Sequence, residues 1–257
     1  MNENLDYKLS NKILSDSAGR ALSLIITKMI KNKGFPYNVY SILIESCVNS
    51  VCDYAGEVTG FTAYESKKRI FLRAARAFLG LPKSSPVAAV TAEIDWLESM
   101  YRTQLKMVRQ YGRVLRMPNH RLTRLIVEWD QRLSNNVDFS TWSKEINQIF
   151  SDNNLLHIYE SKQIFNTKLT VDTIRKSMLM QQNFDQSLLC KTFSKLKVYV
   201  SVKNFRDKST FLAKPLSFIQ RKNYCKAIMG ILPINEEILR YSRPILPAEK
   251  NIVIFVL

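Results

Sequence analysis

Five basic residues recur at intervals of four and three positions in one stretch of the chain, a spacing that suits phosphate binding. They are Arg102, Lys106, Arg109, Arg113 and Arg116. On an α-helix this spacing places all five side chains on a single face. No acidic residue lies between Tyr101 and Met117, so nothing within the stretch neutralises that face. Basic stripes of this kind are typical of proteins that contact the nucleic-acid backbone.

A shorter basic group precedes the stripe. Arg69, Arg73 and Arg76 are also spaced four and three positions apart, and they form a similar face on an earlier helix. Like charges on one helix repel each other by about a few tenths of a kcal/mol for each adjacent pair. Something outside the helices should therefore offset the repulsion. We predict that all eight residues contact the backbone of RNA, DNA or an RNA–DNA hybrid.

The whole chain carries the same bias in charge. Among its 257 residues, 38 are Lys or Arg and 22 are Asp or Glu, which gives a net charge of +16. A charge of this size informs about partners rather than about fold, and it favours a polyanion. One alternative is a solvated basic face that is paired with the carboxylates of Glu45, Asp53 or Glu57. Another is a protein-interaction module whose basic face docks an acidic partner.

The patterns that carry catalysis or hold a cofactor are missing from the sequence. No glycine-rich phosphate loop occurs, and the two histidines, His120 and His157, are isolated. Two-metal nucleotidyl transfer needs converging carboxylates, yet the sequence contains no Asp-Asp pair. Its four cysteines include no Cys-x-x-Cys pair, and we expect them to be reduced thiols. We predict no catalytic residue, no metal and no cofactor.

The elements that position these residues are expected to be helices. Only 7 glycines and 8 prolines interrupt the chain, and apolar residues recur at three- and four-residue spacings. The predicted helices cover about residues 10–31, 36–55, 63–79, 87–92, 96–117, 122–133, 141–150, 171–195 and 217–232. Residues 197–202 alternate enough for a short strand or an extended link, and residues from 241 onward are expected to be extended. The fold class is therefore mainly α, with little or no sheet.

Aromatic side chains offer stacking surfaces for nucleic-acid bases. At helical spacing they more often belong to the core. We expect Trp96, Trp129 and Trp142 to be core residues, and we leave Tyr111 open between the two roles.

No stretch of the sequence reaches the ~20 apolar residues that a membrane span needs. The first nine residues also lack an apolar signal core. We therefore expect a soluble intracellular protein with no membrane partner. The polar residues 151–154 are the expected boundary between a first domain, 1–150, and a second, 151–257.

Short segments spread over nearly the whole chain share their order and spacing with a known family. They are Asp16–Leu22, Glu45–Tyr54, Phe78–Gly80 with Pro82, Trp96–Leu97, Tyr101–Arg102, Arg121–Thr123, Trp129–Asp130, Trp142–Ile146, Lys195–Val200 and Gly230–Ile234. Together they resemble the region that follows the polymerase palm in reverse transcriptases of non-LTR retrotransposons.

The resemblance implies that residues 1–150 are a thumb-like helical bundle with a basic face. It also implies that residues 151–257 are a helical connector with an extended C-terminal tail. We expect the catalytic palm to be absent, and the family's cysteine-rich knuckle too, because Val253–Val256 stands where a Cys-x-x-Cys belongs. The chain would then be a reverse-transcriptase-derived fragment that binds nucleic acid without catalysis, with the other domains of its parent polyprotein as partners. The remaining alternative is a decayed open reading frame with no selected function.

Overall fold

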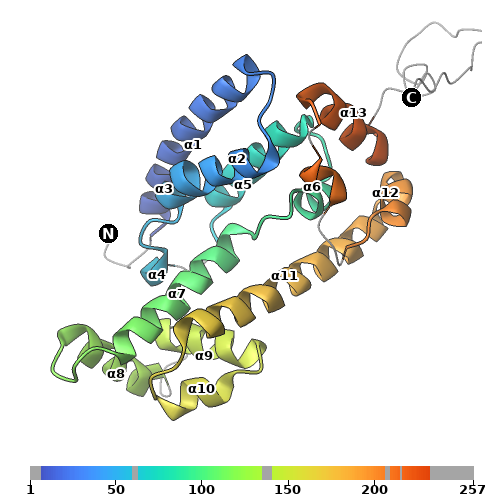
Figure 1. Cartoon of the computed structure of the whole chain (residues 1–257). Helices are drawn as coiled ribbons and strands as arrows, with labels where there is room; N and C mark the ends of the chain where they lie inside the picture. Colours follow the sequence, from blue (N-terminus) through green and yellow to red (C-terminus); the bar gives the residue numbers. More distant parts are fainter. Residues whose placement is uncertain (1–6, 60–62, 135–140, 206–208, 215, 232–257) are drawn as a thin grey trace, which may run out of the picture.

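The computed structural model describes residues 7–59, 63–134, 141–205, 209–214 and 216–231. Every regular element in these ranges is helical, and none is a strand (Figure 1). The prediction of a mainly α fold is therefore confirmed. No helix in the same ranges has both the length and the apolar character that crossing a membrane requires. The predicted extended tail from residue 241 lies outside the described residues.

The first two predicted helices are present, and the second contains a π-helical turn. α1 spans Lys8–Lys31. The second helical run begins directly after Pro36 and has three parts, α2 (Tyr37–Leu43), a π-helical turn (Ile44–Asn49) and α3 (Ser50–Cys52). Such turns are rare and often occur at functional sites. Here the π-helical turn faces a cavity, which is described below.

The middle of the chain carries the helices with the basic faces. These elements are α4 (Gly56–Thr59), α5 (Glu65–Leu79), α6 (Val87–Ile94), α7 (Ser99–Leu115) and α8 (Leu122–Ser134). α5 ends at Gly80, whose φ of 68° is a left-handed conformation that glycine adopts without steric cost. A Cβ atom at Gly80 would also lie 2.7 Å from the side chain of Lys222, so the glycine allows close approach of the helix that carries Lys222.

The final part of the described chain is also helical. Its helices are α9 (Trp142–Asp152), α10 (Leu156–Ser161), α11 (Thr167–Thr192), α12 (Lys197–Val202) and α13 (Phe218–Ile228). Thr141 caps α9 by accepting a hydrogen bond from the backbone N–H of Lys144. A full capping box, in which Ser217 and Gln220 each accept from the other's backbone N–H, starts α13.

The prediction of a strand or an extended link at residues 197–202 is wrong, because this segment is α12. Its valines and tyrosine favour strands locally, yet β-propensity depends strongly on packing. In the helix Tyr199 is buried, and its hydroxyl donates to the carboxylate of Glu93 at 2.8 Å. Val198 and Val202 are left exposed on another side of the helix. This tertiary contact of Tyr199 outweighs the local alternation.

Two hydrophobic clusters form the interior. The first joins α1, α2, α5 and α6 to residues near and beyond the end of α11, including Cys190, Tyr199 and Cys225. The second joins α7, α9 and α10 to the first half of α11, including Ile174 and Met178. Helix α11 therefore contributes to both clusters, and Figure 1 shows it running from the α9–α10 end of the molecule to the α12 end.

Helix α13 packs onto the first cluster. Arg221 of this helix is buried, with its guanidinium carbon 3.7 Å from the centre of the Phe78 ring. Its Nε donates to the carbonyl of Phe78 at 2.8 Å. Each of the two clusters contains residues from both sides of residues 151–154. The domain boundary that we placed there stays a prediction.

Candidate nucleic-acid interface

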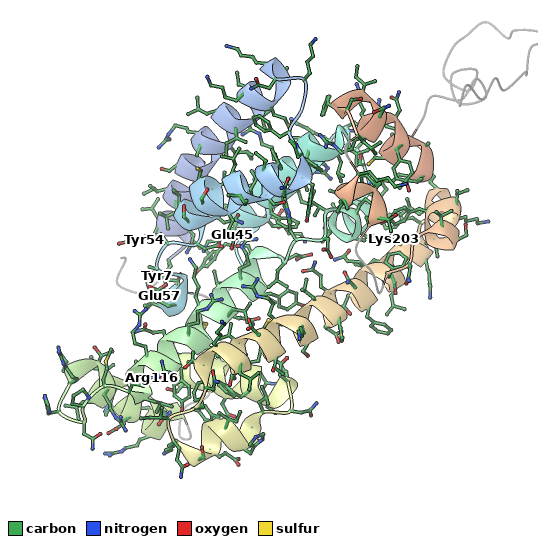
Figure 2. The ribbon with its side chains drawn as sticks, in the orientation of Figure 1. Tyr7, Glu45, Tyr54, Glu57, Arg116 and Lys203 are labelled. Carbon is green, nitrogen blue, oxygen red and sulfur yellow. The ribbon has the colours of Figure 1, made fainter. Side chains whose placement is uncertain are left out.

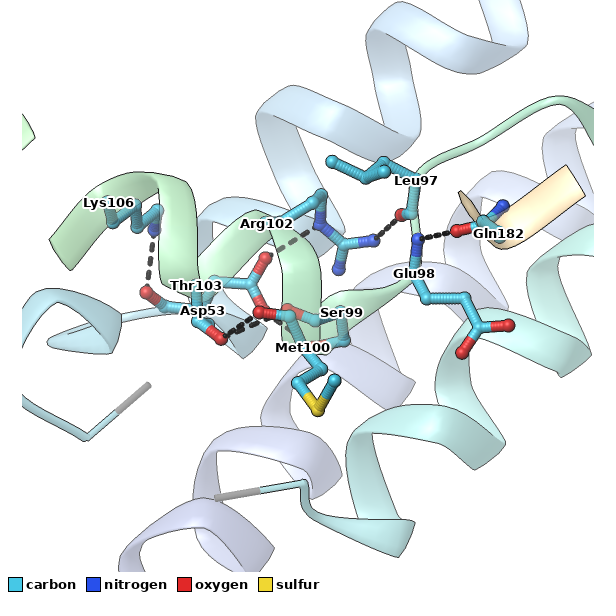
Figure 3. A network of polar contacts seen from close by, with 9 residues as sticks. All are labelled: Asp53, Leu97, Glu98, Ser99, Met100, Arg102, Thr103, Lys106 and Gln182. Atoms are coloured by element: carbon cyan, nitrogen blue, oxygen red, sulfur yellow. Dashed lines mark hydrogen bonds and ion pairs between the residues drawn. The ribbon is translucent and has the colours of Figure 1, made fainter. Parts of the chain in front are cut away.

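The first two residues of the basic stripe on α7, Arg102 and Lys106, are bound to one buried acidic residue, Asp53 (Figure 3). Asp53 follows α3 and is 1% exposed. Its Oδ2 accepts from Nε of Arg102 at 2.9 Å, and its Oδ1 accepts from the hydroxyl of Ser99 at 3.0 Å. Nζ of Lys106 donates to the backbone carbonyl of Asp53 at 2.6 Å. Asp53 therefore joins α3 to two turns of α7.

These contacts fix Arg102 and Lys106 in place. Arg102 also donates from Nη1 to the carbonyl of Leu97 at 2.8 Å, just before α7 begins. A third basic side chain, Lys67 of α5, is 4% exposed, and burial lowers its pKa while the nearby Asp53 charge opposes that change. The alternative of a solvated basic face predicted pairing with Glu45, Asp53 or Glu57, and the pair between Arg102 and Asp53 agrees with it. Both Arg102 and Lys106 hold the fold together.

Arg109 lies one turn further along α7 and is exposed. It faces Arg175 of α11 across a cavity. Partial burial lowers the pKa of the Arg109 guanidinium, and the charge of Arg175 lowers it further, whereas Asp172 and Glu45 oppose the change. Two guanidinium groups of like charge thus stand close together at this point.

The last two residues of the stripe, Arg113 and Arg116, are also exposed. Arg116 donates from Nη2 to the hydroxyl of Thr167 at 2.9 Å and to the carbonyl of Phe165 at 3.2 Å. Figure 2 shows Arg116 near the end of α7 that leads to α8. We call Arg102 and Lys106, which are bound to Asp53, the inner half of the stripe. Its outer half consists of the exposed residues Arg109, Arg113 and Arg116.

The three arginines of α5 have other neighbours. Arg69 lies 3.7 Å from Glu65 on the surface, and Arg73 donates to the hydroxyl of Ser23 on α1 at 2.9 Å. Arg76 donates to the carbonyl of Ser85 at 3.0 Å, and burial lowers its pKa. Within the described residues, no hydrogen bond or ion pair joins these arginines to the stripe on α7. The structure does not bring the two predicted groups together into one cluster.

The aromatic predictions have mixed outcomes. Trp96 and Trp142 are half-buried and pack against the two clusters, and Tyr111 is fully buried. The prediction of a core position for Trp129 is wrong, because this side chain is 62% exposed on α8. Helical spacing identifies a face, but it does not show whether another helix covers that face.

One basic residue of the cavity was not singled out by the sequence. Arg175 lies on α11, where basic residues form no periodic pattern, so only the fold reveals that it faces Arg109. Among the described residues, no group of three or more His, Cys, Asp and Glu side chains has an arrangement that would hold a metal ion.

No protein-family model, curated protein or solved structure matches this chain. In the residues that the structure describes the chain is all-helical, and its sequence is strongly basic. The inner half of the predicted phosphate-binding stripe is bound internally, and the outer half is exposed.

Proposed function

We propose that this protein binds the backbone of RNA, DNA or an RNA–DNA hybrid through the outer half of the stripe on α7, without catalysis of its own. The observation that carries the proposal is the exposure of Arg109, Arg113 and Arg116 on one face of a helix whose inner basic residues are already paired. Phosphate oxygens are the natural partners of exposed guanidinium groups, which bind them in bidentate geometry.

Charge supports this choice of partner. The net charge of +16 attracts polyanions, and bound phosphates would offset the repulsion between neighbouring arginines of the stripe. Arg102 and Lys106 contribute indirectly, because their contacts with Asp53 hold α7 in position. The role of Arg69, Arg73 and Arg76 is secondary in this proposal, since no hydrogen bond or ion pair within the described residues joins them to the stripe on α7.

The order of the sequence motifs supports a second part of the proposal, an origin in the thumb and connector of a non-LTR retrotransposon reverse transcriptase. A mainly α fold agrees with such an origin and with many others. The parent polyprotein would then supply further partners.

The test is the salt dependence of binding to a short single-stranded oligonucleotide, measured by fluorescence anisotropy. Replacing Arg109, Arg113 and Arg116 together with Gln removes three candidate phosphate contacts. Each lost contact should reduce the slope of log affinity against log salt by about 0.7, so the slope should fall by roughly two units.

A matched control removes three exposed basic residues from α1, namely Arg20, Lys28 and Lys31, and changes the net charge by the same amount. We expect this control to retain a steeper slope than the triple variant. Equal slopes for the two variants would mean that binding depends on net charge alone. A chain that ignores the oligonucleotide but captures an acidic protein would favour the protein-interaction alternative.

A further inference from the structure

A cavity of about 560 Å³ lies beside the stripe, between the π-helical turn, α7 and α11. Its size falls within the range of small-molecule sites, about 300–1,000 Å³. Ile44, Glu45 and Asn49 of the π-helical turn form one wall. Arg109 and Arg175 line the cavity from the two longer helices.

Basic side chains in this cavity differ in whether they have partners. Arg102 and Lys106 are bound to Asp53, as described above. Arg109 and Arg175 make no ion pair within the described part of the chain, although Asp172 and Glu45 lie near enough to influence Arg109. An anion placed between these two guanidinium groups would relieve their mutual repulsion and accept hydrogen bonds from both.

An aromatic and apolar surface lies in the same cavity. Trp96 belongs to the lining together with Leu97, Leu105 and Leu179. The indole is held rigidly, because its Nε1 donates to the hydroxyl of Ser41 at 3.0 Å and its ring stacks on Tyr40 with centroids 5.9 Å apart. A fixed indole at the wall of a cavity is a suitable surface for a planar base.

Polar groups complete the lining. Glu45 is exposed and lines the cavity, and Figure 2 shows it close to the region where α3 approaches α7. Asn49 and Ser50 lie nearby on the same wall. A carboxylate is a good acceptor for ribose hydroxyl groups, as in dinucleotide sites. Because the lining holds four basic and three acidic residues, a bare phosphate ion is a poorer match than a phosphate attached to a nucleoside. The seven are Arg102, Lys106, Arg109, Arg175, Glu45, Asp53 and Asp95.

We propose that this cavity binds a nucleoside phosphate, with the phosphate between Arg109 and Arg175 and the base against Trp96. The choice of a nucleoside as ligand rests on the proposed nucleic-acid binding function. The same chemistry has two sources, the phosphorylated end of a bound strand or a free nucleotide. In either case the cavity is a site for a single nucleotide, and it shares Arg109 with the surface that contacts the strand backbone.

Isothermal titration calorimetry of the full chain with AMP tests the proposal, with adenosine and ribose phosphate as partial ligands. AMP should bind more tightly than either part. The double variant Arg109→Gln/Arg175→Gln should weaken AMP binding by about tenfold for each arginine removed. The control Arg20→Gln/Arg132→Gln removes the same charge from exposed positions outside the cavity, and it should bind AMP as the unmodified chain does.

Two oligonucleotides separate the possible sources. If a terminal phosphate strengthens oligonucleotide binding, and the double variant removes that gain, the ligand is a strand end. If only free AMP responds to the double variant, the ligand is a free nucleotide. Both results support the proposal.

The proposal is overturned if AMP does not bind and a terminal phosphate leaves the affinity for the oligonucleotide unchanged. It is also overturned if the double variant and its control bind AMP equally well. An oligonucleotide without terminal phosphates reports separately on the proposed function. If this oligonucleotide still binds in a salt-dependent way while AMP does not bind, only the cavity proposal fails. If it no longer binds while AMP still does, only the proposed function fails.

Discussion

Replacing Asp53 with Asn should destabilise the fold substantially, because Asp53 is the buried counter-charge of Arg102, with Lys106 and Lys67 nearby; we call these four residues the Asp53 cluster. The Asp53 side chain is 2% exposed, and that of its partner Arg102 is 18% exposed. Breaking a buried ion pair by removing one partner costs about 3–5 kcal/mol. Arg102 keeps its hydrogen bond to the carbonyl of Leu97 and reaches some solvent, so we expect a loss of about 3 kcal/mol.

Urea unfolding followed by circular dichroism measures this loss. The midpoint should fall without a change in slope, since the substitution should leave the surface exposed on unfolding unchanged. In thermal unfolding the same loss should lower the Tm by roughly 6–12 °C. A double-mutant cycle with Arg102→Gln then isolates the coupling between the two side chains.

The control is Glu65→Gln, which removes the pair between Glu65 and Arg69. Those side chains are 66% and 77% exposed, and their atoms are 3.7 Å apart. Such a pair contributes little, so the change should stay within about 0.5 kcal/mol. If Asp53→Asn is as mild as this control, the role assigned to the Asp53 cluster is refuted.

Three further predictions concern packing, pH and surface position. Gly112→Ala should lower the free energy of unfolding in urea by about 1–3 kcal/mol, because its Cβ would collide with Thr167 at the start of α11. The control Gly19→Ala meets only the flexible end of Ile70 and should lower it less. Burial raises the pKa of Cys190 to about 11 and that of Cys225 to about 12 from an ordinary 9.0, so the free energy of unfolding should fall as the pH rises from about 9 towards 12. Iodoacetamide should modify the exposed Cys47 before these two buried thiols. Trp129→Ser should change the unfolding free energy by less than about 0.5 kcal/mol, and a larger loss would contradict its exposed position.

Local periodicity was enough to predict most of the helices. The apolar spacing in α1 and α7 and the glycine after α5 are signals that the chain carries within a few residues of each helix. The helix over Lys197–Val202 was missed because it depends on the contact of Tyr199 with Glu93, which lies 106 positions earlier. No local pattern contains that information.

The basic stripe shows the same limit at the candidate site. Periodicity places Arg102 and Arg109 on one face of α7, but it does not reveal what opposes each of them. Asp53 meets Arg102 from 49 positions away, and Arg175 reaches the cavity from a helix with no basic rhythm. The sequence therefore predicted the helix and the spacing of its basic residues, while the division into a paired inner half and an exposed outer half required the fold.

That division is tested most directly by comparing two variants in two assays. One variant replaces Arg109, Arg113 and Arg116 with Gln, and the other replaces Arg102 and Lys106 with Gln. The outer variant should lose roughly two units of salt slope in oligonucleotide binding and keep its stability. The inner variant should lose stability in urea and, where it is still folded, keep its slope. The account is contradicted if the outer variant binds as the unmodified chain does, or if the inner variant loses slope rather than stability.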